Sequence, residues 1–367
     1  MEVITLIQGN EESSLTPFFL VHAISGIALP FLRLDPLGDN DRPVYGITNH
    51  IHCPGNEHLE YPSSLTALAK RYLRDVQKVQ PHGPYLLGGW SMGGMIAMFM
   101  AQILEARDEE VLKVIMIDSA NPEVFPNFRD TEEHKAFTNA TCSKISQQLD
   151  INNLDNSPPE SSPAAQIRTI DYPTVSQQGQ WDTINTGGSG SGSVSSSASS
   201  VFDFYTPNTR PGTPVSPPCS SEGSSAFCSD EESDLDVEEY WDDFEEHHEM
   251  TQLKDLLHNI NFHVHQGLGL IASVSPGDLF RPGTKSDFDV LLIKCRPEPL
   301  EVYQSHHNLN GAEFVWSIMR EKSMRWDSSR FRSFETVPFS GEHDGAFEPQ
   351  HVGELSMILR AGLEKLG

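Results

Sequence analysis

The chain has 367 residues, enough for one large α/β domain or two smaller ones. Its formal net charge of -27 argues against nucleic acids and anionic membranes as partners, since both require basic surface. No apolar run is long enough for a transmembrane span and no secretion signal opens the chain. The five cysteines lack CxxC spacing, which favours free thiols and a cytoplasmic location.

Short apolar runs alternate with helical patterns over the first 125 residues. Each run is hydrophobic throughout, which indicates a strand buried on both faces; the runs lie at 17–21, 44–47, 84–87 and 114–117. A helix is predicted from Leu65, after the capping pair Ser63-Ser64, and Pro81 ends it. A second helix is predicted at 95–105. This alternation predicts an α/β fold with a mostly parallel sheet covered by helices on both faces.

A glycine-rich turn at 88–94 (Gly-Gly-Trp-Ser-Met-Gly-Gly) joins the third strand to the second helix. Strand, Gly-x-Ser-x-Gly and helix in succession predict a nucleophile elbow with Ser91 as the nucleophile. Gly89 and Gly93 are the elbow glycines, because side chains at these positions would collide in so tight a turn. The alternative is a turn that merely connects a strand to a helix.

Residues 151–250 differ from the rest of the chain in composition. They are rich in Ser, Pro and Gly and contain 18 acidic residues against two basic ones. Such a segment buries too little apolar surface to offset the entropy of ordering, so we expect a disordered, low-complexity insert. It would lie within a lid region over 125–285 of a single domain over 1–367. A solvated linker is one reading of the insert, and a binding segment for a basic partner is the other.

The residues after the insert are expected to be ordered. Leu253 begins an amphipathic pattern that predicts a helix in the lid, and strands are predicted at 288–294 and 334–339. A helix at 352–366 closes the chain.

A serine nucleophile requires a base, and the base requires an acid that holds it in one tautomer. In α/β-hydrolases the three follow the chain order Ser, acid, His. Asp118 directly follows a predicted strand and is the candidate acid; a capping or turn role is its alternative. His343 lies in the loop after the last strand and is the candidate base, with His351 as the alternative.

The oxyanion of a tetrahedral intermediate requires two backbone donors. The N–H of Met92, next to the nucleophile, is one candidate. The other is expected from the loop at 22–26, where the N–H of Ile24 or Ala23 is the candidate donor. His22 precedes the nucleophile by almost seventy residues, so we interpret it as a residue that shapes this loop.

Together these segments resemble the α/β-hydrolase thioesterases that accompany polyketide synthases and nonribosomal peptide synthetases. The resemblance covers about 1–125 and 285–367, and it is carried by 18–22, 80–94, 115–119 and 341–343. It implies that Ser91, Asp118 and His343 correspond to the nucleophile, acid and base of that family. The chain departs from the family in its Ser-rich acidic insert and in the sequence His-Ala-Ile-Ser-Gly after the first strand.

The resemblance implies an acyl chain held as a thioester on the phosphopantetheine of a carrier protein, released by hydrolysis or cyclisation. It is greatest with fungal examples, and because no carrier segment precedes the domain we expect action in trans. No cofactor is implied, and the histidine-rich loop at 50–58 lacks the pattern of a metal site. An esterase for a free small molecule and a non-catalytic scaffold that recruits partners through the insert are the alternatives.

Overall fold

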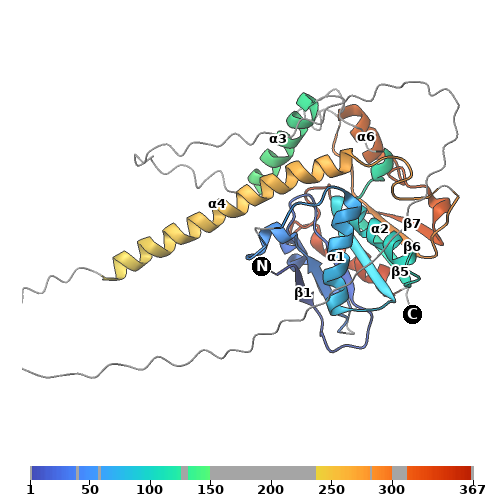
Figure 1. The fold of residues 1–367 in the computed structure, drawn as a ribbon, viewed down its shortest axis with the longest axis horizontal. Helices are drawn as coiled ribbons and strands as arrows, with labels where there is room; N and C mark the ends of the chain where they lie inside the picture. The colour runs from blue at the N-terminus through green and yellow to red at the C-terminus, as the bar shows by residue number, and fades with distance from the viewer. Residues whose placement is uncertain are drawn as a thin grey trace, which may run out of the picture. The chain divides into compact units, whose positions relative to one another are not determined.

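The computed structural model describes residues 2–38, 41–56, 59–124, 131–148, 237–281, 283–299 and 312–364. These residues contain a seven-stranded sheet with the order β1-β3-β2-β4-β5-β6-β7 (Figure 1). The strands are β1 (Ile4–Gln8), β2 (Phe18–Val21), β3 (Val44–Ile47), β4 (Tyr85–Trp90), β5 (Val111–Ile117), β6 (Asp289–Lys294) and β7 (Ser333–Pro338). Strand β1 pairs antiparallel with β3, and the other neighbouring pairs are parallel. The predicted mostly parallel α/β fold is confirmed.

Alternate residues of each strand pack into separate cores on the two faces of the sheet. In β2, Phe19 and Val21 belong to one core, and Phe18 and Leu20 belong to the other. The first core is covered by α1 (Leu65–Val79), α2 (Met92–Glu105) and the C-terminal part of α4 (Val237–Ala272). The second is covered by the 3-10 helix η1 (Leu29–Arg33) and by α7 (Val352–Glu364). Helices on both faces explain why the strands are apolar throughout.

The first two helices have sharply defined starts. Helix α1 begins after Ser64, whose hydroxyl accepts the N–H of Ala67 at 3.1 Å, and it ends at Val79, just before Pro81. Helix α2 begins at Met92, three residues before the helix predicted at 95–105. The two glycines that follow Met92 mask the helical pattern in the sequence, although they occupy the first turn of the helix.

Among the described residues, three further α-helices lie between β5 and β7. They are α3 (Thr131–Gln148), the long α4 and α6 (Ala312–Arg320). Besides η1, the described residues contain the short 3-10 helices η2 (His50–His52), η3 (Pro122–Val124) and η5 (Ser328–Arg330). Within the described residues, no helix is both long and apolar enough to cross a membrane.

Helix α4 begins within the range predicted for the insert. Residues 237–250, which composition placed in the disordered insert, form the first part of this helix. The segment is rich in Glu, a good helix former, and no proline interrupts it before Ala272. Residues 151–236 of the predicted insert lie outside the described residues, as do 125–130, 149–150 and 282 of the predicted lid.

Candidate active site

The candidate site lies where the strand order reverses. From β2 the chain runs to β3 on one side, whereas β4 lies on the other side of β2. Ligands of open α/β sheets bind outside the carboxyl ends of the strands at such a point. Ser91 follows β4, the loop at 22–26 follows β2, and Asp118 follows β5. The fold therefore brings three segments that carry predicted site residues to one edge of the sheet.

Ser91 occupies a strained backbone conformation. Its φ of 57° and ψ of -121° lie outside the regions that non-glycine residues favour, and its N–H donates to the carbonyl of Ile117 at 2.8 Å. A side chain at Gly89 would collide with the backbone of Gly93, and one at Gly93 would collide with the carbonyl of Val21. The turn thus requires glycine at both positions that the sequence identified, and it presents the serine at the N-terminus of α2.

Hydrogen bonds connect Ser91, His343 and Asp118 in a chain. The Ser91 hydroxyl lies 3.0 Å from Nε2 of His343 and can donate to it. On the other side of the ring, Nδ1–H of His343 donates to Oδ2 of Asp118 at 2.8 Å. The structure therefore brings together the three side chains proposed as nucleophile, base and acid.

Asp118 is a buried carboxylate with donors on both oxygens. While Oδ2 accepts from His343, Oδ1 accepts from Nζ of Lys294 at 3.0 Å and from the N–H of Cys295 at 3.1 Å. Burial by itself would raise the pKa of Asp118, but the hydrogen bond and charge of His343, together with Lys294, lower it below its ordinary value. The carboxylate therefore stays ionised at neutral pH.

His343 has a pKa above its ordinary value of 6.5. Burial opposes its charged form, yet the hydrogen bond and charge of Asp118 outweigh that effect. The Trp90 ring lies 6.0 Å from the imidazole, between centroids. The alternative base, His351, lies elsewhere: its ring packs edge-on against Phe339, 6.1 Å between centroids.

A mostly apolar cavity of about 170 Å³ opens beside the Ser91 hydroxyl. Helices α3, α4 and α6 supply much of its wall, which includes Phe137, Ile145, Leu268, Ile271, Val315, Trp316 and Met319. Ile24 and Met92 line it next to Ser91. Of the two predicted donors in the loop at 22–26, Ile24 faces this cavity, and the carbonyl of Ala23 accepts the N–H of Gly26 at 3.0 Å.

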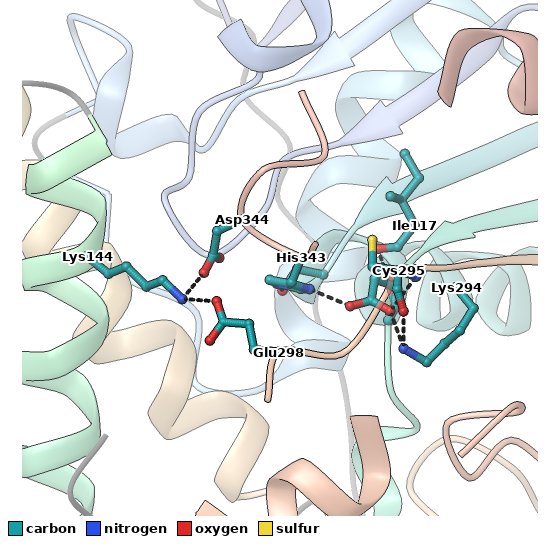
Figure 2. A network of polar contacts seen from close by, with 10 residues as sticks. Ile117, Lys144, Lys294, Cys295, Glu298, His343 and Asp344 are labelled. Carbon is teal, nitrogen blue, oxygen red and sulfur yellow. Dashed lines mark hydrogen bonds and ion pairs between the residues drawn. The ribbon is translucent and has the colours of Figure 1, made fainter. Parts of the chain in front are cut away.

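Charged side chains form one part of the cavity wall, and Figure 2 shows the contacts that Lys144, Glu298 and Asp344 make with one another. Lys144 of α3 donates to Glu298 at 2.8 Å and also pairs with Asp344, the neighbour of His343. Burial lowers the pKa of Lys144, but the two carboxylates more than offset that effect, so the pKa lies above its ordinary value. This network connects α3 to the loop that carries the candidate base.

Two further histidines of the N-terminal half, His22 and His50, have structural partners. His22 is fully buried and its Nε2 lies 2.5 Å from the hydroxyl of Tyr72, and His50 pairs with Asp75 at 2.8 Å. His58 lies outside the described residues. In the described part of the chain, no group of three His, Cys, Asp or Glu side chains is arranged to hold a metal ion.

Sequence reasoning missed the residues around the triad. Lys294 could have been noticed in the sequence, because it is a charged residue at the end of an apolar strand. The register of β5 and β6 pairs Ile117 with Ile293, so the residues that follow, Asp118 and Lys294, lie beside each other. Lys144 and Glu298 carry none, because they are separated by 154 residues and their contact depends on how α3 packs.

The fold and the geometry around Ser91 define the class as an α/β-hydrolase. Comparison with known proteins agrees: the thioesterase domain family matches residues 16–162. The thioesterase pytI of Aspergillus terreus is 32% identical over 375 residues, with 100% of both chains covered. The chain therefore belongs to the thioesterase family.

Two further comparisons extend this result. The non-reducing polyketide synthase stmB of Aspergillus ustus is 36% identical over 124 residues, which is 34% of this chain and 6% of that synthase. The crystal structure of a four-domain nonribosomal peptide synthetase bound to AMP and glycine has a TM-score of 0.53 at 14% identity, over 98% of this chain and 20% of that chain. At that identity the structural likeness concerns the fold alone.

Proposed function

We propose that the protein is a serine thioesterase that releases or edits acyl chains held as thioesters on a carrier protein of a polyketide or nonribosomal peptide assembly line. The observation that carries the proposal is the chain of hydrogen bonds from Ser91 through His343 to Asp118 at the end of an apolar cavity. Similarity to part of a polyketide synthase supports the assembly line as the source of substrate.

In the first half-reaction, Oγ of Ser91 attacks the thioester carbonyl carbon while Nε2 of His343 takes the hydroxyl proton. The oxyanion that forms is stabilised by the N–H groups of Met92 and Ile24, and the N-terminus of α2 adds a favourable dipole. The C–S bond then breaks, and His343 returns its proton to the leaving sulfur. The product is an ester of Ser91, and the carrier leaves as the free thiol.

In the second half-reaction, His343 takes a proton from water or from a hydroxyl or amine of the acyl chain itself. That nucleophile attacks the Ser91 ester, and Oγ regains the proton from His343 when the ester bond breaks. Water gives a free acid and an internal nucleophile gives a ring. The buried Asp118 holds the imidazole in one tautomer and stabilises its charged form in both halves. These steps use side chains and backbone only, so we propose that no cofactor is needed.

The cavity supports an acyl chain with a substantial apolar part. Its wall includes Ile24, Met92, Leu268 and Ile271, apolar side chains whose burial against hydrocarbon is favourable. We therefore expect long or aromatic acyl groups to be processed faster than acetyl.

The test is unloading of an acyl-phosphopantetheine carrier protein, followed by intact mass of the carrier, with wild type and Ser91→Ala. Unloading that depends on Ser91 supports the proposal. A carrier that stays loaded while small oxygen esters are cleaved would replace it with an esterase for free small molecules. If neither substrate reacts, the chain is a non-catalytic scaffold.

A further inference from the structure

Three consecutive carbonyls of the loop after β2 are bound by three different histidines. His22 donates a ring N–H to the carbonyl of Ala23 at 2.6 Å. His263 donates to that of Ile24 at 2.8 Å, and His52 donates to that of Ser25 at 3.1 Å. Since each carbonyl accepts from a ring, each of these ring nitrogens carries the hydrogen. The loop that holds the proposed oxyanion donor is therefore fixed from the side of its carbonyls.

These histidines form one buried cluster. The ring of His263 meets that of His22 edge-on, with centroids 4.9 Å apart, and it lies 6.2 Å from that of His52. His22 and His263 are fully buried. Burial lowers the pKa of His22 to about 3 and that of His52 to about 4, so both rings are neutral and each has a single N–H to donate.

His263 differs from the other two because it comes from helix α4, more than two hundred residues along the chain from the loop. Its Nδ1 supplies the bond to Ile24, while Nε2 has no hydrogen-bond partner among the described residues. One turn further along α4, a side chain at Gly267 would lie 2.8 Å from Cδ1 of Ile24 and 2.9 Å from Sδ of Met92. Helix α4 therefore lies directly against both residues proposed to stabilise the oxyanion.

We infer that His263 is a positioning residue for the oxyanion hole: its Nδ1–H holds the carbonyl of Ile24 and so fixes the Ile24–Ser25 peptide. That peptide adjoins the one that carries the Ile24 N–H, and fixing it keeps this N–H available to the developing oxyanion. The inference rests on the proposed function. It makes helix α4 part of the catalytic apparatus, because the hole is complete when α4 is seated on the loop. His263 acts through Ile24 and has no contact of its own with the reacting atoms in this scheme.

The test compares two amides that differ in where they place a donor. In His263→Asn the side-chain amide occupies the position of Nδ1, and in His263→Gln it reaches toward the position of Nε2. We expect the Asn variant to keep kcat within a few fold of wild type. The Gln variant should lose the bond to the Ile24 carbonyl, which displaces the backbone N–H of the oxyanion hole. We expect its kcat to fall on the order of 10²-fold, with little change in KM.

His265→Gln, two residues along the same helix and half-buried, is the matched control and should keep wild-type kcat. Equal kcat for the Asn and Gln variants would overturn the inference, as would a loss confined to KM. A separate thermal melt of each variant checks that it is folded at the assay temperature. If Ser91→Ala keeps its activity, the proposed function itself fails; if Ser91→Ala is inactive and His263→Gln is not, only the role of His263 fails.

Discussion

The Nζ of Lys294 lies 3.0 Å from Oδ1 of Asp118, and the two side chains are 10% and 0% exposed. Strands β5 and β6 run parallel in a register that pairs Ile117 with Ile293, so both charged residues leave the sheet side by side. The lysine occupies one carboxylate oxygen and leaves the other for His343. It stabilises the negative charge on which the proposed base depends, without contacting the base.

Replacing Lys294 by Met should both destabilise the fold and shift the pH dependence. Removing one partner of a buried pair costs about 3–5 kcal/mol, measured as the free energy of unfolding in urea. Without Lys294, the charge of Asp118 stabilises protonated His343 more strongly, which raises the pKa of His343. The acid limb of kcat/KM should therefore move to higher pH. Lys78→Met is the control, because Lys78 is 75% exposed in its pair with Asp75. An unchanged acid limb in the Lys294 variant would contradict this account.

Activity should rise with pH through the pKa of His343. The proposed base works when neutral, and its pKa lies above 6.5 because Asp118 outweighs the effect of burial. The enzyme is therefore expected to lose activity as the pH falls through that raised value. A profile of kcat/KM from pH 5 to 9 gives the apparent pKa. An acid limb centred at or below 6.5 would show that another group controls the rate.

Alanine at positions 343 and 351 should have opposite outcomes. His343 bonds to Ser91, so His343→Ala should lower kcat on the order of 10⁴-fold or more. His351 packs against Phe339, so His351→Ala should keep most of the activity and lose some stability. Steady-state rates and thermal melts of the two variants decide. An active His343→Ala beside an inactive His351→Ala would reverse the assignment of the base.

Lys144→Met tests the link between α3 and the loop of His343. The change leaves the Glu298 and Asp344 carboxylates without their shared cation, which should cost about 1–3 kcal/mol in unfolding free energy. The positive charge of Lys144 also lowers the pKa of His343, so its removal should shift the acid limb upward. Lys135→Met, exposed on the same helix, is the control. Identical melts and pH profiles for the two variants would show that the link has no effect.

The sequence was sufficient for the central part of the fold because buried parallel strands leave continuous apolar runs. Five of the seven strands, β2 to β6, and the helices around the elbow could be located in this way. Strand β7 was also predicted, at 334–339, although its residues alternate between partly buried and exposed. Strand β1 was missed because its residues are only partly buried and give no such run. Helix α3 was missed as well, because its sequence, Thr131–Gln148, is mostly polar and gives weak helical periodicity.

For the site as well, the sequence predicted some residues and not others. Ser91, Asp118 and His343 could be proposed from the sequence because each follows a predicted strand, and strand ends converge at one edge of a parallel sheet. His263 could not be assigned a role in this way. Its contact with Ile24 depends on how helix α4 packs across the loop, and that packing joins segments separated by 239 positions.

The most direct test of the central claim is a rapid-quench experiment in which the enzyme is mixed with an acyl thioester and its intact mass is measured within milliseconds. We predict a mass increase equal to the acyl group, located by peptide mapping on Ser91 and absent from Ser91→Ala, which should also lose turnover on the order of 10⁴-fold. An acyl group on another residue, or a Ser91→Ala variant that still turns over, would contradict the acyl-serine mechanism.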